Sequence, residues 1–458
     1  NFSFNYLIDM KNNLNNFLEN NQNPTMSDLL DITYSPGLKK NLTEKFSFTF
    51  TPPIFEDWLS PRFSYVPTYI WTRDVLSGAQ GTADIKSDNK FTGNFSFSFQ
   101  KFIEKFYTSE KKTTSSSYST SRGRKKSSSS SKSSESIKPF EIDQPHFKTI
   151  FKFLHDIGQR VSSINVTYIY KIQNIFNNVS ADIDPNYNFK LGFINEPSED
   201  NLTNTSSTTI LSSSNTFNQE LRFNTSVQIT DNLSLSNMEY RVSLSANKQS
   251  DSGYNENVSQ SYFPLGPSGK DGIPLFSWSI NLRGLEKYAF LGKWFKSFTI
   301  NHSYSGEKTT VSLENVIQKI DYKRNFTPFI GLKMKTNNFP LDINLTYNNI
   351  LTISNENEQI KRENSDQINL KFDYTKKTGF RIPVFFLRDF DLDNEINLEV
   401  TLGFEDSQEL FSYYETNEIS DFETLNFRKT YNIKPEITYN FSKFVDANLW
   451  YDYIFIND

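Results

Sequence analysis

Side chains capable of chemistry are sparse in this sequence and are not spaced as a reactive site requires. No Gly-rich phosphate loop follows a strand-like run, and there is no His-x-x-x-His pair or G-x-S-x-G motif. The absence of cysteine excludes disulfides, thiolate metal sites and thiol nucleophiles together. Of the three histidines, His146, His155 and His302, we interpret His155 as a packing or polar-face residue because apolar residues surround it at helical spacing. We therefore predict no enzyme, no catalytic residue and no cofactor.

Two groups of aspartates have the residue type, but not the full pattern, of a calcium site. They are Asp182 with Asp184, and Asp389 with Asp391 and Asp393. The second group, in DFDLDNE, lacks the turn glycine and the distal glutamate of a calcium-binding loop. We interpret it as a solvated turn and predict no metal site.

The composition is that of strands with two different faces. Aromatic residues make up 16% of the 458 residues, with 43 Phe and 23 Tyr, yet the mean hydropathy is −0.57 and the apolar total only 36%. Aromatics spread among Asn, Ser and Thr are expected when each strand shows one face to lipid or core and the other to water. A biased genome would also explain the excess of Asn, Lys and Ile.

Runs in which every second residue is apolar recur along the chain and predict roughly fifteen strands. They cover residues 2–8, 46–50, 91–99, 161–170, 221–229, 233–246, 276–282, 298–304, 341–347, 368–374, 396–404, 433–441 and 445–455. A change of phase near Asn237 suggests a β-bulge. Long strands joined alternately by tight turns, such as Asp231-Asn232, and by long polar loops are typical of membrane β-barrels. The predicted fold is all-β, an antiparallel transmembrane β-barrel segment that forms an open arc of a very large barrel.

The alternation assigns a side to each residue of these strands. Polar residues such as Asn344, Asn369, Lys371, Asn397 and Glu399 would face a water-filled lumen. The residues predicted to face lipid are Phe95, Phe97, Leu221, Phe223, Trp278, Ile280, Leu345, Leu370, Leu398, Val400, Leu449 and Tyr451. No run approaches the 18 apolar residues of a transmembrane helix.

The predicted organisation has three parts. Residues 1–107 carry barrel strands and an aromatic girdle at 55–71, for which packing in a soluble sandwich is the alternative. Residues 108–145 contain a Ser/Lys-rich loop that cannot bury enough apolar surface to order itself, although its Arg and Lys could contact anionic lipid, polysaccharide or a partner. Residues 146–458 carry further strands with short helical insertions.

Several segments between the strands are expected to be helical or irregular. Short helices are predicted at 25–32 and 147–157 and a helical turn near 285–292, whereas the polar segment 195–215 and the charge run at 356–363 are expected to be loops. The net charge of −5 is mild, and no folded segment predicts nucleic-acid binding.

Three stretches carry a resemblance to a known family. They are WSINLRGLEK at 278–287, FKSFTINHSY at 295–304 and FTPFIGL at 326–332. In this order they resemble the C-terminal barrel region of the SprA (Sov) outer-membrane proteins, the translocon of the type IX secretion system. The resemblance is closest over 273–373 and looser in the N-terminal half. The motifs are structural, and the Ser/Lys tract and the short length depart from the family's pattern.

The resemblance implies part of a protein-conducting pore in the outer membrane of a Gram-negative bacterium. Such a pore exports folded cargo proteins to the cell surface and, in relatives, serves gliding motility. It also implies as partners outer-membrane lipid, secreted cargo proteins, a PorV-like shuttle barrel and a periplasmic plug protein. Two alternatives stay open: another outer-membrane barrel, for lipopolysaccharide insertion or TonB-dependent uptake, and a soluble β-rich adhesin.

Overall fold

The structure of the protein is a computed structural model. It describes residues 1–13, 38–53, 57–73, 82–105, 145–180, 184–197, 212–249, 253–377, 380–381, 391–392, 394–415, 418–419, 421–440 and 445–457. The predicted helix at 25–32, the Ser/Lys tract, Asp182, Asp389 and Asp393 lie outside these residues.

The described chain is almost entirely β-structure, which confirms the predicted fold class. The strands are β1 (Phe2–Asn13), β2 (Leu38–Phe50), β3 (Leu59–Arg73), β4 (Thr82–Phe97), β5 (Ile164–Ser180), β6 (Ser212–Gln228), β7 (Leu233–Gln249), β8 (Gly253–Phe263), β9 (Ile273–Pro274), β10 (Ser277–Leu282), β11 (Phe295–Leu313), β12 (Val316–Thr336), β13 (Leu341–Glu356), β14 (Gln359–Lys376), β15 (Phe380–Arg381), β16 (Asp391–Leu392), β17 (Ile396–Glu415), β18 (Glu418–Ile419), β19 (Glu423–Asn440), β20 (Asp446–Trp450) and β21 (Tyr453–Asn457). The helices are α3 (Phe99–Glu104), α4 (Pro145–Gly158), α5 (Tyr187–Lys190) and the 3₁₀ turn η2 (Leu285–Lys287).

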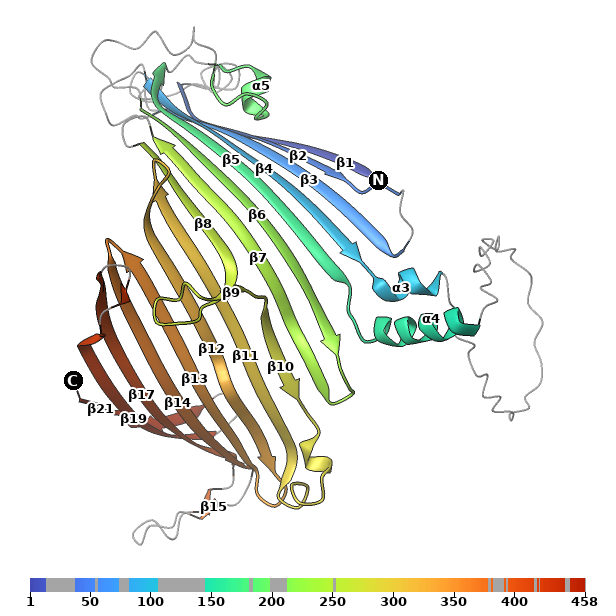
Figure 1. The fold of residues 1–458 in the computed structure, drawn as a ribbon, viewed down its shortest axis with the longest axis vertical. Coiled ribbons are helices and arrows are strands. Elements are labelled where there is room, and N and C mark those ends of the chain that lie inside the picture. The colour runs from blue at the N-terminus through green and yellow to red at the C-terminus, as the bar shows by residue number, and fades with distance from the viewer. Residues whose placement is uncertain are drawn as a thin grey trace, which may run out of the picture.

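The long strands form one curved and twisted antiparallel sheet in which each pairs with its neighbours in the sequence (Figure 1). Strand β1 forms one edge, next to the N-terminus, and β20 with β21 forms the other, next to the C-terminus (Figure 1). The described sheet is therefore an open arc that does not close on itself.

Two positions in the sheet are each filled by a pair of shorter strands. Strands β8 and β10 lie one after the other between β7 and β11, and each pairs with one part of both neighbours. At the edge, β20 and β21 keep one register against β19, since Trp450 lies opposite Glu436 and Tyr453 opposite Ile433. The gap between them faces Pro435, which has no N–H to donate to the ladder. Counted in this way, the described residues fill fifteen positions: β1 to β7, β8 with β10, β11 to β14, β17, β19, and β20 with β21.

A β-bulge interrupts β7, as the sequence predicted. Asn237 has a φ of +53°, and the register between β6 and β7 shifts between Thr225 and Val227. The bulge moves the apolar positions of β7 from odd numbers, such as Leu235, to even numbers, such as Tyr240, so one face of the sheet stays apolar.

Two predicted loops contain more strand than expected. The charge run at 356–363 is a hairpin in which Asn357 and Glu358, with φ of 49° and 63°, form a two-residue turn between β13 and β14. The polar segment 195–215 ends in the first residues of β6, which begins at Ser212. In both places backbone pairing extends the strands past the stretch where apolar residues alternate.

The described helices lie at the ends of strands. Helix α3 follows β4, with the Ser98 hydroxyl accepting a hydrogen bond from the Lys101 N–H as N-cap. The predicted helix at 147–157 is α4, which lies beside α3 (Figure 1). The helical turn predicted near 285–292 is η2. None of the helices in the described ranges is long and apolar enough to cross a membrane.

Candidate functional site

The two faces of the sheet differ in chemistry along its whole width. Residues paired between antiparallel strands point to the same side, so the register defines rows of side chains that cross the sheet. One row on what we call the apolar face consists of Leu233, Leu282, Ile300, Leu332, Leu345, Leu370, Leu402, Ile433 and Tyr453. The adjacent row, on what we call the polar face, consists of Ser234, Asn281, Asn301, Gly331, Thr346, Asn369, Gly403 and Asn432.

In the N-terminal half the apolar face is mainly aromatic. One row there consists of Phe4, Phe48, Tyr65, Phe91 and Tyr170. The ring centroids of Phe4 and Phe48 lie 5.0 Å apart, and those of Phe48 and Tyr65 lie 6.4 Å apart. Strand β6 connects this half to the other, because its odd-numbered residues include Leu221 and Val227, and Val227 pairs with Leu235.

The apolar rows form a belt that ends at a charged row on one side and at exposed aromatic residues on the other. At one limit the same face carries a charged row, in which Asp366 accepts hydrogen bonds from the Tyr347 hydroxyl and the Asn349 amide, both at 2.8 Å. In the same row the Lys429 ammonium lies 3.4 Å from Asp406. The other limit lies at the turns that precede β11 and β13, where exposed aromatics gather. These are Tyr288, Phe290, Trp294 and Phe339.

The belt has a definite height. From Leu341, the first residue of β13, to Tyr347 the chain advances roughly 20 Å at about 3.4 Å per residue. For strands tilted by about 35–45°, this corresponds to a band roughly 15 Å tall.

The polar face is lined by amides, hydroxyls and paired charges. Ion pairs on it are Lys171–Asp88 at 3.0 Å, Arg241–Glu220 at 2.9 Å, Lys319–Asp321 at 3.2 Å, Lys335–Asp342 at 2.6 Å, Lys361–Glu409 at 2.7 Å and Lys371–Glu399 at 2.7 Å. Because these pairs are largely solvated, each contributes at most about 1 kcal/mol to stability. Their effect is to leave the face polar without a large excess of one charge.

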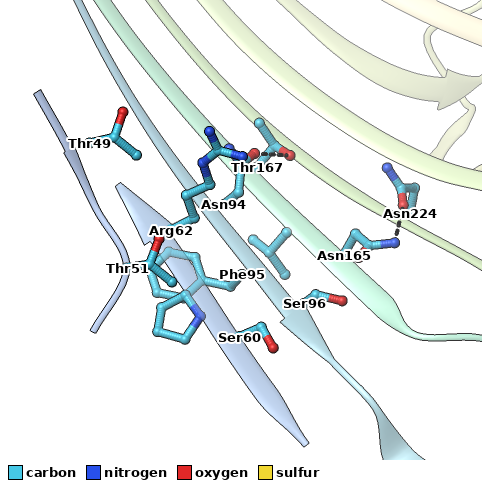
Figure 2. A pocket seen from close by; sticks show the side chains of 12 residues that line it. Thr49, Thr51, Ser60, Arg62, Asn94, Phe95, Ser96, Asn165, Thr167 and Asn224 are labelled. Atoms are coloured by element: carbon cyan, nitrogen blue, oxygen red, sulfur yellow. Dashed lines mark hydrogen bonds between the residues drawn. The ribbon is translucent and has the colours of Figure 1, made fainter. Parts of the chain in front are cut away.

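The polar face is also hollowed. Figure 2 shows an open hollow of about 620 Å³ in which Arg62, Asn94 and Thr167 lie together. The Thr167 hydroxyl donates a 3.0 Å hydrogen bond to the Asn94 side-chain oxygen (Figure 2). A second hollow, of about 190 Å³, is lined by Arg241, Lys323 and other polar residues of the same face. A hollow of about 290 Å³ on the apolar face, lined by Tyr170, Phe217 and Ala246 among others, shows that both sides of the twisted sheet are locally hollowed.

The residues predicted to face lipid all lie on the apolar face. The register gives this directly for Phe95, Phe97, Leu221, Phe223, Trp278, Ile280, Leu345, Leu370, Leu398, Val400 and Leu449. Tyr451 lies opposite Pro435, and its N–H donates a 3.1 Å hydrogen bond to the Pro435 carbonyl. Phe97 is partly covered by α3, since its ring centroid lies 5.7 Å from that of Phe102. Whether these side chains contact lipid stays a prediction.

The last strand position departs from this pattern. Trp450, Ile454 and Ile456 lie on its polar face, opposite Glu436, Asn432 and Thr430, and all three are exposed. The edge strands thus carry apolar residues on both sides from Trp450 onward, although Asp446 and Asn448 keep the polar pattern.

Aromatic residues at 278–287, 295–304 and 326–332 form a cluster on the apolar face. Trp278 and Tyr304 have ring centroids 4.3 Å apart, and His302 lies 5.6 Å from Phe326 and 5.7 Å from Phe329. Phe329 belongs to a bulge in β12, and the His302 Nδ1 lies 2.7 Å from its carbonyl oxygen. His302 therefore has packing partners and no reactive neighbour among the residues of this cluster.

A segment at 184–197 folds back over the apolar face beyond the belt. Phe189 of α5 is fully buried, with ring centroids 6.3 Å from Tyr69 and 6.0 Å from Phe176. The same cluster holds Trp71, which is 1% exposed. The expectation of Trp71 as an open girdle residue is therefore wrong, because other side chains cover it.

A buried ion pair fixes this segment. The Lys190 ammonium lies 3.0 Å from Glu44 and 3.0 Å from Asp184. Burial alone lowers the pKa of Lys190, but the hydrogen bonds that its ammonium donates to both carboxylates outweigh it, and the net pKa lies above its ordinary value. Asp184, considered above as a calcium ligand, is thus an ion-pair partner. The described residues contain no group of three or more side chains that could hold a metal ion.

A second segment, between β8 and β9, covers the apolar face nearer the C-terminal half. The Asn355 side-chain amide donates a 3.0 Å hydrogen bond to the Ser268 carbonyl. Beneath this segment lie the buried side chains of Tyr322, Ile353 and Ile360. Both covered regions lie beyond the same limit of the belt. Comparison of the chain with protein-family models and with curated proteins finds no match.

Proposed function

We propose that this chain forms part of the wall of a protein-conducting outer-membrane β-barrel of the SprA-like, type IX secretion kind. The observation that carries the proposal is the pairing of an apolar belt on one face with a polar face rich in amides and ion pairs on the other. The strands supply about 15 Å of the band of about 25 Å on the outside of outer-membrane barrels, and the exposed aromatics at the turns lie next to this part.

In this proposal the polar face lines the passage. A wall of amides, hydroxyls and paired charges stays hydrated and offers a passing protein no apolar surface to adhere to. The lumen would exceed that of a small barrel, because the diameter grows with the number of strands. Cargo proteins, a shuttle barrel and a periplasmic plug are the partners that the resemblance implies. The specific link to type IX secretion rests on that resemblance alone.

The two open edges also support a larger barrel. Backbone N–H and C=O groups at an unpaired edge are not tolerated in hydrocarbon. We infer that β1 and the β20–β21 position pair with further strands in the assembled barrel.

Cysteine labelling tests the assignment of the two faces. In the full-length protein, Asn369→Cys is expected to react with a membrane-impermeant maleimide, while Leu370→Cys is expected to stay unlabelled until detergent is added. The reason is that these neighbours project to opposite faces of β14. Residues 1–458 contain no cysteine, and any cysteine elsewhere in the full-length protein is first replaced by serine. Equal labelling of both sites in intact membranes would reject the assignment.

A secretion assay separates the translocon from other barrels. Cells depleted of the full-length protein are expected to retain cargo proteins in the periplasm. Normal surface display of cargo, with a defect in lipopolysaccharide insertion or in nutrient uptake instead, would favour the alternative barrels. Recovery of the wild-type chain in the soluble fraction would favour the adhesin.

A further inference from the structure

Three cationic side chains gather on the apolar face just beyond the charged limit of the belt. Arg324 of β12 pairs with Leu351, and Arg362 of β14 pairs with Ile353. Lys308 of β11 pairs with Tyr322, one step from Arg324 on the same face. Neighbouring strands lie about 4.8 Å apart, so Arg324 and Arg362 lie on strands roughly 10 Å apart that flank β13, and Lys308 lies on the strand next to Arg324. We call Lys308, Arg324 and Arg362 the basic cluster.

The basic cluster is not neutralised within the described part of the chain. None of its three side chains forms an ion pair there, and the Nε atoms of Arg324 and Arg362 are buried without a hydrogen-bond partner. Arg324 donates one hydrogen bond, of 3.1 Å, to Asn349 and lies over the Phe326 ring. The Lys308 ammonium lies over the rings of Tyr262 and Tyr322.

Nearby carboxylates are already engaged. Asp366 accepts hydrogen bonds from Tyr347, Asn349 and Asn364, and Asp406 pairs with Lys429. The two guanidinium groups lie close enough to repel each other, while the Asp366 carboxylate attracts Arg324 from beyond hydrogen-bond distance. Half-buried cations that repel each other and keep unused donors are the arrangement that an anion with several oxygens stabilises.

The height of the basic cluster relative to the belt points to the source of that anion. Arg324 is level with residue 351, roughly 13 Å along the strand from Tyr347, or about 10 Å along the membrane normal for a tilted strand. The polar layer on each side of the hydrocarbon is about 5–8 Å thick. Arginine and lysine side chains span the remaining distance.

We propose that the basic cluster binds the phosphate group of a membrane lipid whose acyl chains lie along the apolar belt below it. This inference rests on the proposed function, because it needs the apolar face to be in lipid. The belt supplies the apolar surface, and the two guanidinium groups supply paired donors for the phosphate oxygens.

The test compares two lipids that differ only in the phosphate. The full-length protein in detergent is titrated with dioleoyl phosphatidic acid or with dioleoylglycerol, and bound lipid is counted by native mass spectrometry. The wild type is expected to bind phosphatidic acid more tightly than dioleoylglycerol. The double variant Arg324→Gln/Arg362→Gln is expected to bind phosphatidic acid about tenfold more weakly than the wild type. The matched control is Lys323→Gln with Lys361→Gln, which changes the adjacent residues on the polar face and is expected to have no effect.

Each result has a defined meaning. Equal retention of the two lipids by the wild type, or an equal loss in the control, overturns the lipid-phosphate site. Displacement of phosphatidic acid by millimolar inorganic phosphate would assign the cluster to a soluble anion, which also overturns it. Cysteine labelling at 369 and 370 in intact membranes, before extraction into detergent, separates the outcomes, because a failed labelling pattern would reject the membrane assignment itself.

Discussion

Val400→Arg is expected to prevent most of the full-length protein from assembling in the outer membrane. Val400 lies in a central row of the belt, between Phe372 and Pro435. A cation at a lipid-facing site near the middle of the membrane costs about 2–4 kcal/mol, which is a large share of the stability of a marginally stable protein. Heat-modifiable mobility in gels, with the amount recovered in outer membranes, measures the effect.

Two substitutions on the same strand calibrate this prediction. Leu398→Arg is expected to be milder, because Leu398 lies in the row of Leu341, next to the aromatic limit of the belt, where the cost of a charge is lower. Asn397→Arg places the same charge on the polar face and is expected to assemble normally. Equal impairment by Leu398→Arg and Asn397→Arg would mean that the two faces are not lipid and lumen.

Phe189→Ala is expected to release the segment at 184–197 from the sheet. The Phe189 side chain is 0% exposed, and truncation of such a buried aromatic costs about 3–5 kcal/mol. Since this loss falls on the contact with Tyr69 and Phe176, the strands beneath should keep their pairing. Limited proteolysis of the assembled protein is expected to cut near α5 in the variant and not in the wild type.

The control for this prediction lies in the same segment. Phe193 is 69% exposed, so Phe193→Ala is expected to change proteolysis little. If Phe193→Ala were cut as fast as Phe189→Ala, the buried contact would not be what holds the segment. If Phe189→Ala lost its heat-modifiable mobility, the segment would be needed for assembly of the wall.

Alternation of apolar residues predicted most of the sheet because the belt imposes it. Between the two limits, a residue such as Leu370 must be apolar and its neighbour Lys371 must not be, so the backbone period of two is visible in the sequence. The bulge at Asn237 was predicted for the same reason, since it changes the phase of that pattern.

Beyond the belt the pattern no longer constrains the sequence. Lys361 and Glu363 are residues of β14 that pair with Ser354 and Thr352 of β13. Both sides of the sheet are hydrated or covered there, so charged residues are tolerated and their sequence was interpreted as a loop. Phe189 contacts Tyr69, which is far from it in the sequence. The basic cluster likewise brings together residues of different strands. The spacing of residues within one segment predicts neither arrangement.

The order of the strands has a consequence for how such a wall changes size. Each long strand is hydrogen-bonded to its predecessor and successor, so duplication or loss of one hairpin leaves every other ladder as it was. The circumference, and with it the bore, can therefore grow in steps of two strands. In the proposed pore, a larger cargo protein would require additional β-hairpins of the same kind and no new architecture.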